Sequence, residues 1–405
     1  MSTFDGLWDE LLPVGRDPRT GGYRRFAYGD AELACREWFT GAAIARGLDV
    51  VPDRAGNLWA WWGDPDADGP GLVLGSHLDS VPDGGAYDGP LGVVSAFAAL
   101  DALRADGMQL ARPVAVAAFA DEEGARFGIA CAGSRLVTGG LAAERALALT
   151  DVDGVAYAEA VRRAGLDPTV IGRDDEALAR IGTFVELHVE QGQGLVETGA
   201  PVGVGSTIWP HGRWRFSFTG RPDHAGTTRM DDRHDPMLTY AMTALAANKQ
   251  ARLLDARATF GRVEVDPNAT NAIPSQVRAW LDARAPEQST LDDLVANVRR
   301  LALERADRDG TSLAVHTESV TPLVEFDAAL RDRLAMALGG GVPVLPTAAG
   351  HDAGVLAAAG VPTAMLFVRN PTGVSHAPDE HAERDDCLAG VRALAGVVTE
   401  LAGVR

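Results

Sequence analysis

Residues 72–79 read Leu72-Val-Leu-Gly-Ser-His-Leu-Asp79, a short apolar run that ends in a histidine and an aspartate. An apolar run of this length is typical of a strand that is buried on both faces of a parallel sheet. In open α/β sheets, ligands bind in the crevice beyond the carboxyl ends of the strands. The stretch therefore predicts an α/β fold with a functional site where this strand ends.

Metal-ligand residue types recur at four further places, three of them just beyond other apolar runs. The segments read Tyr87-Asp88-Gly, Asp121-Glu122-Glu123-Gly, Glu186-Leu-His188-Val-Glu and Val374-Ser-His376-Ala-Pro. Imidazole and carboxylate groups are common ligands of divalent transition metals. Three imidazoles and three carboxylates in one crevice could hold two divalent cations and leave one acid for catalysis. We interpret the set as the site of a dinuclear metallohydrolase.

The first part of the chain alternates strand and helix signals, which predicts a mostly parallel, doubly wound sheet. The expected strands are 72–75, 114–120 and 183–189, and the expected helices are 90–103, 141–149 and 155–163. The pattern resumes later with a helix at 327–338, a strand at 363–368 and a helix at 384–401. Residues 1–205 and 322–405 are therefore expected to form the metal-binding catalytic domain.

Residues 206–321 follow a different pattern. Strands are expected at 213–219, 261–265, 276–284 and 312–319, with helices at 236–254 and 291–306. This order, β-α-β-β-α-β, is that of a ferredoxin-like unit. The segment is therefore predicted to be an inserted α+β domain.

Composition limits the classes of partner. A net charge of −19 over 405 residues argues against nucleic acid and anionic membranes as partners, but not against a small anionic substrate. The three cysteines form no C-x-x-C pattern, which suggests a reducing compartment. Neither a signal peptide nor an apolar run long enough to span a membrane is evident. The expected location is the cytoplasm.

Spacing suggests roles within the set of ligands. His77 and Asp79 are two residues apart and share one face of an extended segment, so Asp79 could orient the imidazole of His77. Asp88 lies in a glycine-rich loop, where it could bridge two cations. Glu122 and Glu123 point in different directions, so one can bind metal while the other faces the substrate. Taken singly, a His-x-Asp or Glu-Glu pair is more often a cap or a solvated pair.

The remaining histidines divide into two classes. His224, in Pro-Asp-His-Ala-Gly-Thr-Thr, has a credible functional role in a loop of the inserted domain. His351, in Gly-His-Asp-Ala, could either brace the site or act in it directly. Four others carry no pattern and are expected to be structural: His211, His234, His316 and His381.

Several longer motifs resemble a known family. They read Gly75-Ser-His-Leu-Asp-Ser80, Tyr87-Asp-Gly-Pro-Leu-Gly92, Ala120-Asp-Glu-Glu-Gly124, Glu186-Leu-His-Val-Glu-Gln-Gly192, His224-Ala-Gly-Thr-Thr228, Asn271-Ala-Ile-Pro-Ser275 and Gly350-His-Asp-Ala353. With them the chain resembles the dinuclear-zinc aminoacylase/carboxypeptidase superfamily over nearly its whole length. Within it, the chain is most similar to the branch of N-carbamoyl-L-amino acid hydrolases and allantoate amidohydrolases.

The resemblance implies a specific assignment of the metal centre. One metal would be held by His77, Asp88 and His188, and the other by Asp88, Glu123 and His376. Glu122 would be the general base. The two divalent ions would be zinc, with manganese, cobalt or nickel as alternatives because the same ligands suit them.

The resemblance also implies residues that recognise a small carboxylate substrate and its transition state: Gln191, His224, Asn271 and Arg284. A surface ion pair is the alternative for Arg284, and a turn-forming role is the alternative for Asn271. The inserted domain of this family forms a lid and makes the contact of a homodimer. Some of these groups would then come from the partner subunit.

The predicted reaction is hydrolysis of a linear, non-peptide C–N bond in a small N-substituted amino acid, an N-carbamoyl-L-amino acid or allantoate. Two cations about 3.5–4 Å apart lower the pKa of a shared water towards 7, and Glu122 would accept its proton. A deformylase or deacylase of N-acyl acidic amino acids, such as N-formyl-L-glutamate, is the main alternative. A second carboxylate would then bind Arg369 together with Arg213, Arg221 or Arg229. A catalytically silent binding protein is a remote third possibility.

Overall fold

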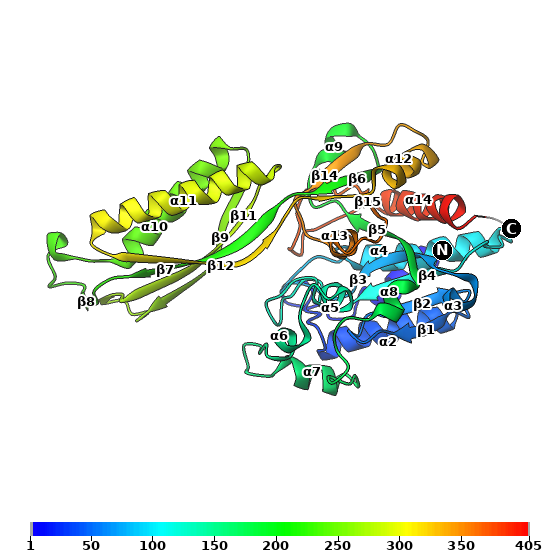
Figure 1. Cartoon of the computed structure of the whole chain (residues 1–405), viewed down its shortest axis with the longest axis horizontal. Coiled ribbons are helices and arrows are strands. Elements are labelled where there is room, and N and C mark those ends of the chain that lie inside the picture. Colours follow the sequence, from blue (N-terminus) through cyan, green and yellow to red (C-terminus); the bar gives the residue numbers. More distant parts are fainter. Residues whose placement is uncertain (1–2, 404–405) are drawn as a thin grey trace. The chain divides into compact units, whose positions relative to one another are not determined.

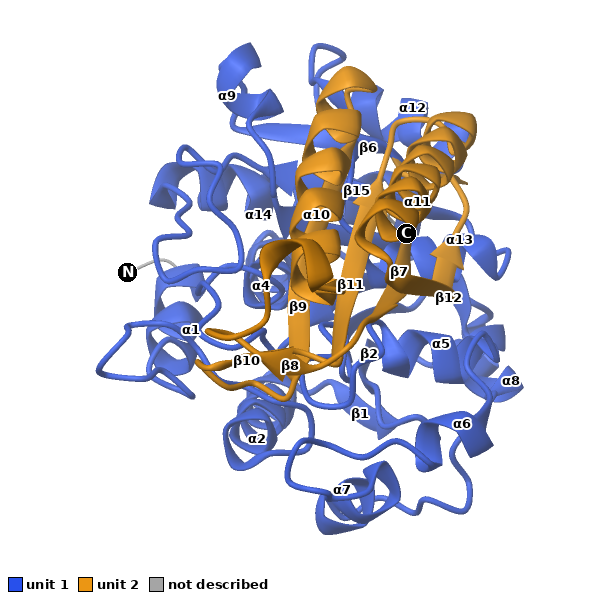
Figure 2. Ribbon diagram, turned by 90° about the vertical axis from the view of Figure 1, so that its left-hand side faces the viewer, with its two compact units in different colours: residues 1–207, 325–405 blue, residues 208–324 orange. Residues whose placement is uncertain are grey.

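The computed structural model describes residues 3–403 and divides the chain into two compact units (Figure 2). Unit 1 comprises residues 1–207 and 325–405, and unit 2 comprises residues 208–324. The sequence places the corresponding borders after residues 205 and 321. Within residues 3–403, no helix is both long enough and apolar enough to cross a lipid bilayer.

Unit 1 is built on a nine-stranded mixed sheet with the order β1-β2-β4-β3-β5-β15-β6-β13, and β14 pairs with β6 (Figure 1). Its strands are β1 (Asp49–Pro52), β2 (Leu58–Trp62), β3 (Gly71–His77), β4 (Val114–Phe119), β5 (Ile181–Val189), β6 (Val202–Ile208), β13 (Val324–Glu325), β14 (Val344–Thr347) and β15 (Thr363–Val368). The four central strands β4, β3, β5 and β15 are parallel. Every residue of β3, β4 and β15 is buried, as expected where helices cover both faces of a parallel sheet.

The helices of unit 1 form two layers on this sheet. They are α1 (Thr3–Leu11), α2 (Asp30–Ile44), α3 (Pro65–Asp68), α4 (Pro90–Ala105), α5 (Ala132–Thr138), α6 (Ala143–Leu147), α7 (Tyr157–Arg163), α8 (Asp175–Ala179), α9 (Gly194–Thr198), α12 (Ala328–Ala337), α13 (Asp352–Ala358) and α14 (Arg384–Ala402). The main core packs α1, α2, α4 and α14 against one face of the sheet. A second core joins α5, α6 and α7.

Unit 2 is a four-stranded antiparallel sheet with the order β12-β7-β11-β9 and two helices, α10 and α11. Its elements are β7 (His211–Thr219), β8 (Asp223–His224), a 3₁₀ turn (Met230–Asp232), α10 (Pro236–Leu253), β9 (Arg257–Asp266), β10 (Ala272–Ile273), β11 (Gln276–Arg284), α11 (Gln288–Asp309) and β12 (Ser312–Thr321). Alternate residues Trp214, Phe216 and Phe218 of β7 are buried against the helices. Figure 1 shows α10 and α11 lying side by side.

The predicted fold class, a mostly parallel doubly wound sheet with an inserted ferredoxin-like unit, is confirmed. The strands 276–284 and 363–368 agree with β11 and β15 at both ends. The sequence reading missed the outer strands β1, β2, β6, β13 and β14.

Candidate metal centre

The parallel strands of unit 1 bring the predicted ligands to one edge of the sheet. His77 is the last residue of β3, and His188 is the last residue but one of β5. The segment with Glu123 follows β4, and the segment with His376 follows β15. Because β4, β3, β5 and β15 run parallel in adjacent positions, their carboxyl ends meet at this edge.

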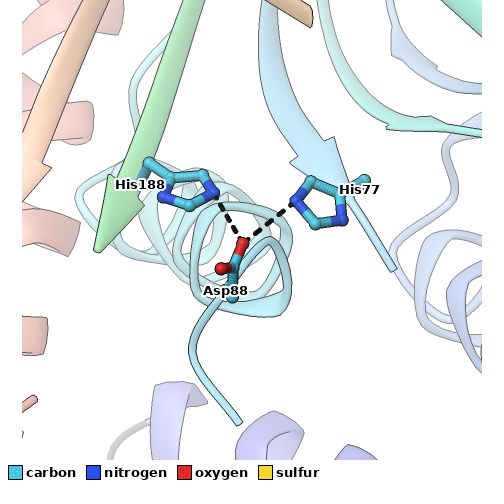
Figure 3. A group of neighbouring side chains, drawn as sticks. All are labelled: His77, Asp88 and His188. Atoms are coloured by element: carbon cyan, nitrogen blue, oxygen red, sulfur yellow. Dashed lines mark ion pairs between the residues drawn. The ribbon is translucent and has the colours of Figure 1, made fainter. Parts of the chain in front are cut away.

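Asp88 is the residue that three histidines approach. The Nε2 atoms of His77 and His188 lie 3.4 and 3.2 Å from its Oδ1 atom (Figure 3). The Nε2 atom of His376 lies 3.4 Å from its Oδ2 atom. One carboxylate therefore faces imidazoles on both of its oxygens, which is the arrangement of a bridging ligand.

Two groups of potential ligands share this carboxylate. The first is His77, Asp88 and His188, and the second is Asp88, Glu123 and His376. In each group the ligand atoms lie within 4.8 Å of one another. The first group is buried, whereas the His376 side chain is 50% exposed. The structure thus gathers all five predicted ligands into the two sets that the sequence proposed.

The ring nitrogens of the buried histidines have distinct environments. The Nδ1 atom of His188 lies 2.9 Å from the carbonyl oxygen of Val189, and that of His77 lies 3.2 Å from the carbonyl oxygen of Asp79. An Nδ1–H that donates to a carbonyl leaves Nε2 as the unprotonated nitrogen. In the neutral form of each ring the Nε2 lone pair then faces Asp88, where a metal would lie.

The buried ligand atoms fit a divalent cation. Among residues 3–403, the Nε2 atoms of His77 and His188 and the Oε1 atom of Glu123 are buried without a hydrogen-bond partner. Buried polar atoms nearly always have a hydrogen-bond partner, and a bound ion is one of the few explanations when they do not. Imidazole nitrogen and carboxylate oxygen are the donors that such an ion would use.

The pKa values of the side chains in the site also indicate a place for a divalent cation. Burial raises the pKa of Glu123 to about 7, and contact with Asp88 raises the pKa of His376 to about 9. Burial alone would raise the pKa of Asp88, but its contacts with His188, His376 and His77 hold that pKa well below the usual range. Without a cation, protons must balance the clustered carboxylates. A divalent ion would replace those protons.

Glu122 is buried beside the first group but belongs to neither. Its Oε2 atom lies 3.8 Å from the Nε2 atom of His77, and the thiol of Cys131 donates to its Oε1 atom at 3.5 Å. Burial raises the pKa of Glu122 well above the usual range. A carboxyl group with a raised pKa beside a metal site suits general acid–base chemistry.

Asp79 positions the segment of the two glutamates. Its Oδ1 and Oδ2 atoms accept hydrogen bonds from the backbone N–H groups of Glu122 and Glu123, at 3.1 and 3.0 Å. Its Oδ1 atom also lies 3.5 Å from the Nδ1 atom of His77. Asp79 therefore links the end of β3 to the segment after β4, a wider role than the orientation of His77 alone.

Gln191 lies against the ligands. Its Nε2 amide donates to Oδ2 of Asp88 at 2.9 Å and to Oγ of Ser375 at 3.1 Å. The structure therefore places it as a brace of the bridging carboxylate. Its Oε1 atom is buried and has no hydrogen-bond partner in the described part of the chain.

His224 and Asn271 are neighbours in unit 2. His224 pairs with Ala272 in the two-stranded ribbon of β8 and β10, and Ala225 N–H donates to the carbonyl of Asn271. The Nδ1 atom of His224 accepts the N–H groups of Gly226 and Thr227 at 2.9 and 3.2 Å. This fixes the ring proton on Nε2, so the exposed imidazole offers a hydrogen-bond donor.

Two arginines have partners of their own. The guanidinium of Arg284 donates to both carboxylate oxygens of Asp282 at 2.8 and 3.2 Å, which is the ion pair considered as its alternative role. Arg369 donates to both oxygens of Asp386 at 2.8 and 3.0 Å. The pairing of Arg369 weakens the argument for a second carboxylate site.

Two further groups lie beside the ligands: His351, for which the sequence suggests a bracing or a direct role, and Glu186, for which it suggests none. The ring of His351 is tilted against that of His188, with centroids 4.5 Å apart. The carboxylate of Glu186 accepts hydrogen bonds from the hydroxyl of Ser76 at 2.7 Å and from the backbone N–H of Ala353 at 3.0 Å. Glu186, His188 and His351 also form a group whose potential ligand atoms lie within 4.8 Å of one another, so the bracing role and the direct role of His351 both stay predictions. Glu186 precedes a ligand by two residues, and that spacing on one strand face could have indicated it.

Known proteins are similar to this chain in both sequence and structure. The chain is 34% identical to an N-carbamoyl-L-amino acid amidohydrolase of Geobacillus stearothermophilus, with 99% of each chain covered. It is 30% identical to the allantoate amidohydrolase of Escherichia coli K12, again with 99% of each covered. A crystal structure of a hydantoinase/carbamoylase family amidase from Burkholderia vietnamiensis superposes with a TM-score of 0.89 at 30% identity, covering 98% of this chain and 97% of that one.

The match extends to a whole family. Residues 73–400 match peptidase family M20/M25/M40, and this range contains all five candidate metal ligands. The predicted resemblance and the predicted enzyme class, a hydrolase, are confirmed. The chain therefore belongs to peptidase family M20/M25/M40.

Proposed function

We propose that the protein is a metal-dependent amidohydrolase that cleaves a linear, non-peptide C–N bond in an N-carbamoyl-L-amino acid or in allantoate. The observation that carries the proposal is the carboxylate of Asp88, which two groups of potential metal ligands share. The relatives named above act on substrates of these two kinds. The ligand set is also complete, which argues against a silent binding protein.

The metals would be two divalent ions, zinc by preference, held by His77, Asp88 and His188 and by Asp88, Glu123 and His376. When bound, such a pair supplies a water of lowered pKa and polarises the substrate carbonyl. Glu122 would accept the proton that the attacking water loses and would deliver it to the leaving nitrogen. Asp79 and Gln191 keep the carboxylates in place.

His224, Asn271 and Arg284 would recognise the substrate. The Nε2–H of His224 would donate to the oxyanion that forms at the carbonyl. Arg284 would bind the substrate carboxylate through its planar fork, after that carboxylate replaces Asp282 as its partner. Asn271 would add an amide donor next to His224.

These three residues lie at opposite ends of one sheet. Gln276 pairs with Thr219 at one end of β11, so His224 and Asn271 belong to the segments at that end, whereas Arg284 is the last residue at the other end. A nine-residue strand spans about 27 Å at 3.4 Å per residue, far more than a small amino acid derivative. One substrate cannot contact both ends of the same unit 2. A homodimer resolves this, because the partner subunit can supply His224 and Asn271.

The surface of unit 2 supports a homodimer. Leu238, Met242, Leu245 and Leu253 are 44–67% exposed and recur on α10 at helical spacing. Beside this helix, β9 is an edge strand that pairs only with β11 among the described strands. An apolar helix face next to an open sheet edge is a surface that a second copy can cover.

We also propose a cytoplasmic location. Cys35, Cys131 and Cys387 are free and buried, as expected for thiols in a reducing compartment.

Product analysis tests the proposed reaction. Metal-reconstituted protein given N-carbamoyl-L-amino acids or allantoate should release ammonia. N-formyl-L-glutamate should yield little formate, because Arg369 is paired with the buried Asp386, whereas Asp282, the partner of Arg284, is partly exposed and easier to replace. Ammonia and formate are assayed separately in each reaction. Formate without ammonia would replace the proposal by the deformylase alternative.

Glu122→Gln should lower kcat about 10²–10⁴-fold, because it removes the group that moves the proton. The metal content should stay unchanged, since Glu122 belongs to neither ligand group. Steady-state kinetics and elemental analysis of the same preparation measure both effects. Activity near that of the wild type would exclude Glu122 as the base.

The wild type should bind two zinc ions per chain, and His188→Ala and His376→Ala should each bind one. Affinity should increase between pH 6 and pH 9, because Glu123 with a pKa of about 7 and His376 with a pKa of about 9 must lose protons before they bind metal. Calorimetry at several pH values measures stoichiometry and affinity. The exposed His316, replaced by Ala, is the control. A single ion in the wild type would contradict the dinuclear proposal.

Mixed dimers test the shared site. Arg284→Ala and His224→Ala should each be nearly inactive alone. After the two variants are unfolded and refolded together in equal amounts, activity should recover to about a quarter of the wild-type value, because half the dimers are mixed and each has one intact site. Mixing without subunit exchange serves as the control. No recovery after verified exchange would show that one chain supplies both groups.

A further inference from the structure

The loop that carries Asp88 is held by a carboxylate from far along the chain. The backbone N–H groups of Tyr87 and Asp88 both donate to the Oε1 atom of Glu380, at 3.0 and 2.9 Å. Glu380 is 4% exposed. Two consecutive N–H groups that share one buried acceptor fix the orientation of the peptide between them, and hence the direction of the Asp88 side chain.

The same residue is tied to a second ligand. Glu380 follows His376 by four residues, and its own N–H donates to the carbonyl of Ala377 at 3.1 Å. A compact turn therefore joins His376 to Glu380. Asp88 and His376 face each other in the second ligand group, so one short segment holds both sides of it.

The approach of the Asp88 loop to Glu380 leaves no room for a larger residue. A Cβ atom built on Gly85 would overlap the carboxylate and the Cβ of Glu380. The backbone of Gly85 is not in the left-handed region, so the need for glycine here is steric. The chain passes directly against the Glu380 side chain, and a methyl group at residue 85 would push the two apart.

We propose that Glu380 is a positioning residue of the metal centre, which fixes the bridging carboxylate of Asp88 relative to His376 and thereby sets the affinity for both metal ions. The inference rests on the proposed dinuclear site. Glu380 acts through the backbone, as Asp79 does for the N–H groups of Glu122 and Glu123. Each loop that carries a carboxylate ligand thus has its own buried acid as an acceptor.

The test compares four variants of the full-length protein. Glu380→Met keeps the length of the side chain but removes the acceptor. Glu380→Gln keeps an oxygen that can accept both N–H groups. Gly85→Ala displaces the loop while leaving Glu380 in the chain. The control is Asp174→Leu, because Asp174 is buried and also accepts two backbone N–H groups, from Arg54 and Ala177, in a part of unit 1 without candidate ligands.

Zinc affinity is measured by competition with a chromophoric chelator, and thermal unfolding of the metal-free protein is recorded beside it. Glu380→Met and Gly85→Ala should bind zinc about 10–100-fold more weakly than the wild type, the usual loss when a partner of a ligand is removed. Glu380→Gln should remain close to the wild type. Asp174→Leu should lower the unfolding temperature without changing the zinc affinity.

Several results would overturn the inference. Wild-type zinc affinity in folded Glu380→Met would do so, as would a loss in Glu380→Gln as large as that in Glu380→Met. If Glu380→Met does not fold, wild-type affinity in Gly85→Ala would count against it in the same way. A wild type that binds no zinc would overturn the dinuclear proposal and this inference together. The results above, obtained with a wild type that does bind zinc, would overturn this inference alone.

Discussion

The contact of one buried carboxylate with three imidazoles is the constraint on which the site depends. Asp88 is 6% exposed, and His77, His188 and His376 all direct Nε2 towards it. Burying charged groups costs free energy unless they are paired, and these imidazoles can pair with the carboxylate only when they are protonated. A divalent cation would release those protons. Metal binding and the folding of this edge of the sheet would therefore stabilise each other.

His77 and His188 lie on strands, but Asp88, Glu123 and His376 lie on irregular backbone, so the positions of these three depend on hydrogen bonds other than those of the sheet. Three buried acids each accept two backbone N–H groups in the segments that surround the site. Asp79 holds residues 122 and 123, Glu380 holds residues 87 and 88, and Glu190 holds residues 194 and 195. Charge-assisted hydrogen bonds of this kind are about twice as strong as neutral ones. The high density of buried acids thus has two origins, metal binding and the bracing of loops.

The central strands could be predicted from the sequence because their apolar runs are short and their ends carry ligand residues. It was insufficient for β6, whose glycines Gly203 and Gly205 interrupt the apolar pattern, and for strands as short as β13. The role of Glu380 could not be predicted from the sequence either. It depends on contact with Asp88, 292 residues away along the chain, which the strand order brings close. The pairing of Arg284 with Asp282 follows from a local i, i+2 spacing, which the sequence does show.

The geometry of unit 2 constrains any account of specificity. The backbones of Arg284 and His224 lie at opposite ends of β11, and the nine-residue strand sets their separation at about 27 Å. If both contact one substrate, as proposed, they must come from two copies of the chain, and the active site is complete only in the dimer. In the proposed homodimer, the exposed apolar face of α10 would serve catalysis as well as assembly. Substitutions on that face, such as at Leu245, would lower activity by dilution of the dimer rather than by any change at the metals.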